Sequence, residues 1–531
     1  LPSSYFNVWN PDAVGNNQYA LESWHNSYNY WTASKANRQI NWERLYYANT
    51  QAANQGKDAL YFIQAKHSDN PMFNMASTLS AKVTKRSTLV GGLVLGSNSN
   101  RHYQTMDDLL GASFFHNINT YALGTYPASD PRVQYDLNTA GPNNLGSLVY
   151  EGDKFGYDYK IEVMKGLLWT SYTAEMGRFQ TMISAKLGQT NMRRHGYMRN
   201  GMAPNNSEGN SRIARFGEGG AKGSINLDAG KGHVFKIGVG YEWRPPMANA
   251  AFISPEICND YVLNLGDEHV FSSEFSYQYQ NAWVHANVNA YYSRLDHVTE
   301  WQNFYNDDEN SFTYLSMTGL EKEYYGIEAG LDFKVASFLN FKAIGTISDA
   351  KNINNANVNY MLSKSAEVVK DYAYIKVMRE SGTPLTIGSL ALDFHKSGWF
   401  VNLNANWYDR IYLSYSPSYR YKSSLKNRDM LFNDEPLPGS VDQTKGHGGW
   451  MVDGSIGKSI RLKHGSLNFN LMITNILNNR KIVSGGYEQS RSDYTLNKEN
   501  EAKDRVYKFS KNPKKYYVFG TNGMFQVSYR F

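Results

Sequence analysis

Alternation of apolar and polar residues is the strongest pattern along this chain. Over 235–243 every second residue is apolar, and the residues between them are glycine or charged. The same period of two recurs over 327–335, 399–407 and 467–473. Because side chains of a β-strand point alternately to opposite faces, this period predicts strands with one apolar and one polar face. Followed to the end of the chain, it predicts about fifteen strands. These lie near 72–83, 87–98, 161–174, 178–189, 217–228, 232–244, 268–280, 282–295, 316–335, 338–349, 385–395, 398–410, 448–461, 465–476 and 522–531.

Strand length and the placement of aromatic residues distinguish two architectures that share this alternation, a soluble sandwich and a membrane barrel. The predicted strands run to about ten residues or more, whereas strands of globular proteins average about five or six. Apolar rows end in aromatic pairs such as Tyr241 with Trp243, as the interfacial girdles of membrane barrels do. The polar rows carry Asn, Gly, Ser and charge, which suits a water-filled interior. The pattern favours an all-β fold, a large transmembrane antiparallel β-barrel.

The connections between predicted strands alternate in length. Short ones follow Val83, Asp228, Val335, His395 and Leu462. Long ones lie near 98–160, 190–216, 244–267, 296–314, 351–384, 410–447 and 476–521. Short turns on one side and long loops on the other are typical of outer-membrane barrels, and such loops are unusual inside a soluble domain.

Composition narrows the classes further. Aromatic residues make up 14% of the 531 residues, charged residues 19%, and Cys258 is the single cysteine. One cysteine excludes a disulfide scaffold and a cysteine-based zinc module. No stretch approaches the roughly 18 apolar residues of a membrane helix. The net charge of +6 is small and unclustered, so no nucleic-acid partner is expected.

The first 70 residues differ from the rest. They hold Trp24, Trp31 and Trp42 among Asn, Gln and Ser, and we expect an aromatic-rich extracellular loop segment, with a helix within 34–55 and the first strand extended over 57–67. Residues 71–531 are expected to form the C-terminal portion of a transmembrane β-barrel. Bacterial single-chain barrels have even strand numbers, so an odd count that starts before a short turn predicts missing strands upstream. A full barrel of about 22 strands would make this chain its C-terminal portion.

Several short motifs resemble one family. The segment 475–481 reads Asn-Ile-Leu-Asn-Asn-Arg-Lys and resembles the Asn-Leu-Phe-Asp-Lys-type box near the end of TonB-dependent outer-membrane receptors, with Leu477 in place of the usual Phe. The segment 325–328, Tyr-Gly-Ile-Glu, resembles a strand opening of the same family. The segment 482–491 resembles a loop of receptors of the Bacteroides type. The final row resembles the signal read by the barrel-assembly machinery and consists of Phe525, Val527, Tyr529 and Phe531.

This resemblance implies a nutrient transporter in the outer membrane of a Gram-negative cell. The family imports scarce or bulky nutrients such as glycans, peptides or metal chelates, driven by the TonB–ExbB–ExbD complex through a plug domain. The plug lies N-terminal to the barrel, and nothing in this sequence matches it. A surface lipoprotein above the loops is a further partner left open. Two alternatives also stay open, a passive porin-like channel and a surface adhesin or receptor barrel without transport.

No catalytic motif is present, so we expect no enzyme. The sequence lacks His-Glu-x-x-His, Gly-x-Ser-x-Gly and the phosphate-cradling Gly-x-x-x-x-Gly-Lys. One cofactor is considered, Ca²⁺, because hard oxygen ligands suit it and the segment 306–310 is an acidic loop tip. Its candidate ligands are Asp307, Asp308 and Glu309. The alternative is a solvated loop.

Aromatic residues in loops are the candidate ligand contacts. Their faces bury apolar area while neighbouring polar groups donate hydrogen bonds, which suits sugars, peptides or aromatic chelators. One group follows Trp407 and consists of Tyr412, Tyr415, Tyr419, Arg420 and Tyr421. The other is Trp24, Trp31 and Trp42. The alternative for both groups is an interfacial girdle or packing of the loops on themselves.

Overall fold

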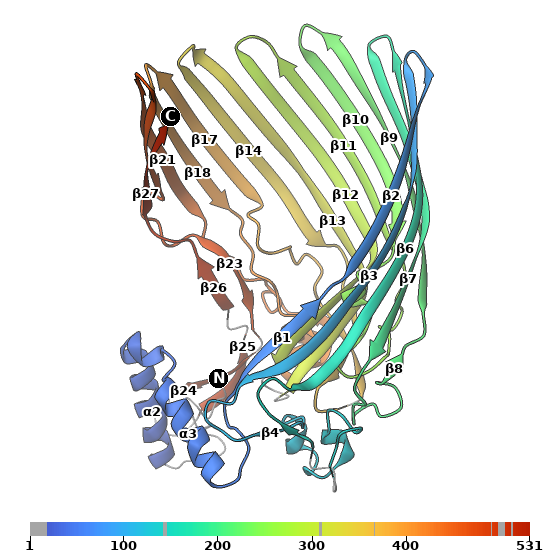
Figure 1. Ribbon diagram of the computed structural model, residues 1–531, viewed down its shortest axis with the longest axis vertical. Helices are drawn as coiled ribbons and strands as arrows, with labels where there is room; N and C mark the ends of the chain where they lie inside the picture. Colours follow the sequence, from blue (N-terminus) through green and yellow to red (C-terminus); the bar gives the residue numbers. More distant parts are fainter. Residues whose placement is uncertain are drawn as a thin grey trace.

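The protein is a large antiparallel sheet of 19 strands that curves around an open interior (Figure 1). The computed structural model describes residues 18–141, 146–306, 311–365, 367–489, 491–496, 505–510 and 513–531. Every segment predicted as a strand contains a strand of this wall, so the predicted all-β antiparallel fold is confirmed. The wall strands are β2 (Met72–Thr84), β3 (Ser87–Asp108), β6 (Lys154–Met176), β7 (Phe179–Gly196), β9 (Ala214–Gly230), β10 (His233–Arg244), β11 (Glu268–Gln280), β12 (Val284–Asn306), β13 (Ser311–Ala336), β14 (Leu339–Asn352), β17 (Thr386–Lys396), β18 (Trp399–Asp409), β21 (Gly449–Leu462), β22 (Gly465–Thr474) and β27 (Asn522–Arg530).

Consecutive wall strands pair with each other, and the sheet ends at two edges (Figure 1). One edge is β2, which pairs with β3, and the other is β27, which pairs with β22. Among the described residues neither strand has a second partner. β1 (Ile63–Asp69) also pairs with β3, beyond β2. The sheet therefore begins inside the segment predicted as a loop. This start agrees with the expected extension of the first strand over 57–67.

The two faces of the wall differ as the alternation predicts. On β10, Ile237 is 59% and Val239 52% exposed. The opposite face carries cross-strand ion pairs, with 2.6 Å between Lys186 Nζ and Glu242 Oε2 and 2.6 Å between Lys236 Nζ and Glu274 Oε1. Phe252 of the loop 245–267 packs on this polar face. Because the loops fold over it, the polar face lines the interior of the curved sheet.

Short turns lie at one end of the wall and long connections at the other (Figure 1). In the β9–β10 turn, Lys231 and Gly232 both have positive φ, 52° and 84°. Two such residues make the tight turn whose twist matches paired strands. A side chain at Gly232 would meet the carbonyl oxygen of Gln280 at 1.9 Å. The predicted alternation of connections is confirmed, and we call the end with long connections the loop end.

Two helices precede the wall and lie at the loop end (Figure 1). α2 (Gln18–Ala33) was not expected, whereas α3 (Trp42–Asn54) lies within the predicted helical range. The side chain of Asn41 caps α3 by accepting a hydrogen bond from the amide of Arg44 at 3.0 Å. The buried Asn49 side chain donates to the carbonyls of Tyr61 and Leu109, each at 2.6 Å. These bonds fix α3 to the end of β3.

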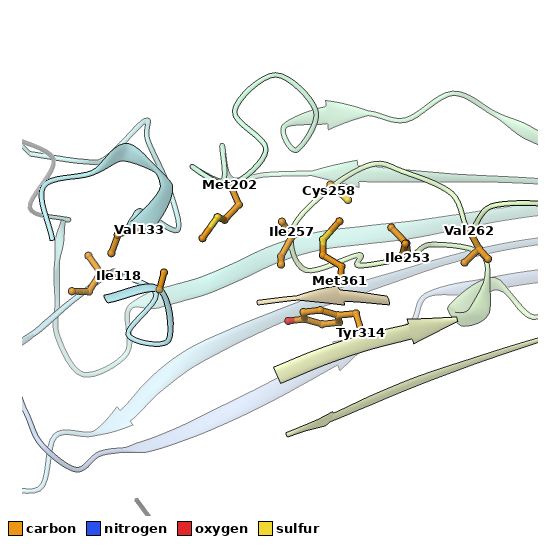
Figure 2. Close-up of a cluster of buried hydrophobic side chains, with 10 residues drawn as sticks. Ile118, Val133, Met202, Ile253, Ile257, Cys258, Val262, Tyr314 and Met361 are labelled. Carbon is orange, nitrogen blue, oxygen red and sulfur yellow. The ribbon is translucent and has the colours of Figure 1, made fainter. Parts of the chain in front are cut away.

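Most buried apolar side chains lie between the loops rather than in the wall. One cluster joins Ile118, Met202, Ile257, Tyr314 and Met361 from segments far apart in the chain (Figure 2). The smaller elements at this end are β4 (Phe115–His116), β5 (Leu148–Val149), β8 (Gly209–Asn210), β15 (Ala356–Leu362), β16 (Val368–Ala373), α4 (Lys422–Asn427), β19 (Leu431–Phe432), β20 (Glu435–Pro436), β23 (Val483–Glu488), β24 (Arg491–Leu496), β25 (Arg505–Ser510) and β26 (Pro513–Tyr517). None of the helices in the described part of the chain has the length and hydropathy needed to cross a membrane.

Candidate functional site

The loop end of the interior contains a cavity of about 250 Å³ around Glu256, which we call the Glu256 cavity. Loops and strand ends that are distant in sequence enclose it, including β1, the connection after β3, the loop 245–267 and the start of β13. Aromatic side chains and polar or charged side chains line it in similar number. Ligand sites commonly combine aromatic walls with polar groups that orient the ligand. The lining includes Lys66, Tyr121, Tyr135, Tyr157, Glu256 and Tyr314.

A tight turn positions Glu256. The amides of Ile257 and Cys258 both donate to the carbonyl of Ser254 at 2.9 Å. Ile253, Ile257 and Cys258 are buried in the cluster of Figure 2, so the residues on both sides of Glu256 anchor the loop. The Tyr314 hydroxyl donates to Glu256 Oε2 at 2.6 Å. The carboxylate is therefore held from a strand and a loop at once.

The electrostatics of the cavity disfavour negative charge on its acidic groups. Burial raises the pKa of Glu256, and the Tyr314 hydroxyl and the charge of Lys66 act in the opposite direction without cancelling the rise. Burial also raises the pKa of Tyr135, so its hydroxyl stays a neutral donor. A positive group in the cavity would stabilise the ionised form of Glu256.

A second cavity of about 300 Å³ lies beside Tyr415 and contains several charged side chains. These charges are already paired. Lys322 bonds Glu380 at 2.6 Å and also bonds Glu300. Arg379 donates to Asp349 at 2.8 Å. Paired charges of this kind hold the loops in place. They leave fewer unpaired charged groups for a ligand than the Glu256 cavity does.

The structure brings the predicted cluster after Trp407 together, mostly in the interior of the loops. Tyr412, Tyr419 and Tyr421 are buried, and Tyr415 lines the second cavity. Arg420 is fully buried and forms an ion pair with Glu488 of β23, with 2.6 Å between Nη1 and Oε2. These side chains therefore pack within the loops, which is the alternative to ligand contact. Ligand contact by this group stays a prediction.

Sequence reasoning missed Glu488, the partner of Arg420. The carboxylate also accepts hydrogen bonds from the amides of Ser416 and Thr444, at 3.1 and 2.8 Å. Burial alone would raise its pKa, but the hydrogen bond and charge of Arg420 hold the pKa of Glu488 below its ordinary value. A separation of 68 residues between Arg420 and Glu488 leaves no local signal of this contact.

The other predicted site residues are spread over the molecule. Trp31 is half-buried against Leu45 and Leu110, and Trp42 is exposed. Trp24 lies in α2, and its side chain is outside what the structure describes. Asp307, Asp308 and Glu309 fall outside the described residues, so the Ca²⁺ site stays a prediction. Within the described ranges no group of three His, Cys, Asp or Glu side chains could hold a metal ion.

The two terminal motifs have distinct settings. Asn475 follows β22 with φ 51°. Its side chain donates to the carbonyls of Asn479 at 3.0 Å and Phe519 at 2.8 Å, so this residue closes the base of the last loop. The row Phe525, Val527, Tyr529 and Phe531 is exposed along β27 and its end. Its recognition by the assembly machinery stays a prediction.

Solved structures share the fold of this chain, whereas sequence comparisons find no relative. No protein-family model matches the chain, and no curated protein matches it by sequence. The solved structure of the ferric citrate transporter FecA is 10% identical with a TM-score of 0.53, covering 88% of this chain and 55% of that one. The copper transporter OprC is 11% identical with a TM-score of 0.56, over 87% and 57%. The FrpB iron transporter from Neisseria meningitidis is 9% identical with a TM-score of 0.50, over 87% and 55%.

Identities this low establish the fold and nothing finer. The chain spans a little over half the length of each of these proteins. The match covers 87–88% of this chain. The chain thus has the fold of the barrels of TonB-dependent outer-membrane receptors.

Proposed function

We propose that this chain forms the larger part of the barrel of an outer-membrane transporter that binds and imports a scarce or bulky nutrient. The observation that carries the proposal is the contrast between the two ends of one wall. Short turns close one end, while at the other long loops pack over the polar interior face and enclose a cavity. Ligand sites commonly occupy the mouths of β-barrels. Glycans, peptides and metal chelates remain the candidate nutrients.

The energy source and setting belong to the same proposal. Import would be driven by TonB–ExbB–ExbD through a plug domain contributed from outside these residues. The outer membrane of a Gram-negative cell is the proposed location, and the Bacteroides-type subgroup rests on the motif at 482–491. The exposed apolar face of the wall supports contact with lipid.

Growth of the native organism tests this function. A strain lacking the complete native polypeptide is compared with the wild type on panels of single carbon, nitrogen and metal sources. We expect a growth defect on one nutrient class, reproduced by depletion of TonB and restored by the intact gene. Uptake that persists without TonB, with steady current through the purified protein in planar bilayers, would indicate a passive channel instead. Unchanged growth combined with lost surface adhesion would indicate an adhesin.

A further inference from the structure

The Glu256 cavity contains one acidic and one basic side chain that do not pair with each other. Glu256 is enclosed by the loops yet keeps part of its side chain exposed to the cavity. Lys66 lines the same cavity from β1, where its side chain is exposed. Among the described residues neither side chain forms an ion pair, although the charge of Lys66 is close enough to influence Glu256. The cavity is thus acidic at its enclosed part and basic at β1.

We propose that the Glu256 cavity binds a zwitterionic group, the ammonium and carboxylate of an amino acid or a short peptide. The ammonium would bond Glu256, and the carboxylate would lie toward Lys66. This inference rests on the proposed import function, since it names the class of nutrient. Hydrogen bonds from an ammonium and hydrogen bonds to a carboxylate are both stronger than neutral ones. A ligand that carries both groups therefore forms two strong hydrogen bonds in the cavity.

Aromatic walls support an ammonium next to Glu256. The rings of Tyr121, Tyr135 and Tyr157 line the cavity, and a cation within about 6 Å of such a ring is attracted to its face. Lys66 Nζ already lies 5.9 Å from the centre of the Tyr157 ring, so the cavity accommodates a cation beside an aromatic face. A ligand ammonium deeper in the cavity would find both a carboxylate and rings.

Hydrogen bonds within the protein hold the walls of the cavity. The Asn119 side chain donates to the carbonyl of Ser363 at 2.5 Å and accepts from the amide of Tyr121 at 3.2 Å. Tyr314 fixes one oxygen of Glu256, and no hydrogen bond to the other oxygen is found among the described residues. Fixed walls lower the entropic cost of binding.

The size of the cavity limits the ligand. Its volume of about 250 Å³ lies below the range of about 300–1,000 Å³ typical of sites for drug-sized molecules. One or two amino-acid residues suit this space, whereas a larger oligomer would place only one end in it. The free ends of a small peptide are therefore the feature that the cavity would recognise.

Calorimetry with matched probes tests the proposal on the full native polypeptide in detergent. The probes are the dipeptide Ala-Phe with free ends, its N-acetyl derivative and its C-terminal amide. We expect Ala-Phe to bind at least about tenfold more tightly than either derivative, since each charged hydrogen bond contributes about 1.5–3 kcal/mol. Equal binding of the three probes would overturn the proposal.

Substitutions test which residue binds each end of the dipeptide. Glu256→Gln should weaken Ala-Phe about tenfold and leave the N-acetyl derivative unchanged, while Lys66→Met should weaken Ala-Phe and leave the amide unchanged. Control variants are Glu175→Gln and Lys463→Met, exposed positions near the opposite end of the wall. The proposed orientation would be overturned if Glu256→Gln left the binding of the amide unchanged and Lys66→Met left that of the N-acetyl derivative unchanged. If a variant fails to fold, the three probes on the unaltered protein still decide.

The dipeptide-binding result and the transport result can fail independently of each other. Binding in detergent requires no energy source, so it can succeed even where uptake proves independent of TonB. Conversely, TonB-dependent uptake of another nutrient without dipeptide binding would overturn this inference and leave the transport function standing.

Discussion

The wall and the loop end are stabilised in opposite ways. Val239 of the wall is 52% exposed, whereas Leu413 and Leu315 at the loop end have no exposed surface. Wall side chains contact mainly their cross-strand neighbours, and the apolar face has no protein covering within the described part of the chain. The loop end instead buries its own apolar clusters. The wall therefore depends on surroundings outside the chain, while the loop end is packed like the interior of a soluble protein.

The largest expected effect comes from breaking the buried pair of Arg420 and Glu488. Arg420→Met leaves Glu488 buried and uncompensated, at a cost of about 3–5 kcal/mol. We expect the loops around Ser416 and Thr444 to open, since both amides donate to Glu488. Hydrogen exchange should show lost protection at these two amides while the wall strands stay protected.

The double variant Arg420→Met/Glu488→Met is the matched control. Replacing both charges with apolar side chains should cost much less, because no charge is left unpaired. A double variant as unstable as the single one would indicate that the pair acts through shape rather than charge.

A charge on the apolar face of the wall gives the next largest effect. Val239→Arg should cost about 2–4 kcal/mol if the site lies near the bilayer midplane. Lys236→Arg, on the polar face of the same strand, should cost little. Urea unfolding in lipid vesicles measures both. Equal costs at the two positions would contradict the assignment of faces.

A smaller effect is expected where α3 meets the wall. Asn49→Ala removes side-chain hydrogen bonds to Tyr61 and Leu109 and should cost about 1–3 kcal/mol. Limited proteolysis should then cut α3 faster while the wall resists. Asn54→Ala at the exposed end of α3 serves as the control. Cleavage of both variants at the same rate would show that Asn49 does not attach the helix.

The smallest expected effect is a pH dependence confined to the loop end. The pKa of Glu488 is lower in the folded protein than its ordinary value. Its contribution to stability is therefore complete above the ordinary pKa of Glu and is lost as pH falls through the lowered one. The loss is about 1.4 kcal/mol for each unit between the two values. Proteolysis of the loop 410–448 between pH 6 and 3 measures it, and Glu488→Gln should abolish the pH dependence.

The wall could be predicted from sequence because alternation is a local property. That Ile237 and Lys236 face opposite sides of the sheet follows from the strand that carries both. The loop end has no such rule. α2 was not expected, although Leu21, Trp24, Tyr28 and Trp31 recur at helical spacing among Asn and Ser residues that suggest a loop. The Glu256 cavity joins β1, β13 and the loop 245–267, and Arg420 finds Glu488 across two connections. Contacts of that kind depend on the tertiary arrangement, and aromatic residues in a loop sequence do not reveal whether they point inward.

The two edges of the sheet impose a requirement on assembly. Along the outer sides of β2 and β27, backbone amides and carbonyls have no partner strand among the described residues. In hydrocarbon each unpaired group costs several kcal/mol, because no water is available there. For the proposed location in the outer membrane, strand addition and entry into lipid must therefore proceed together. A chain that reached the membrane with both edges bare would recruit any extended segment nearby, including a second copy of itself.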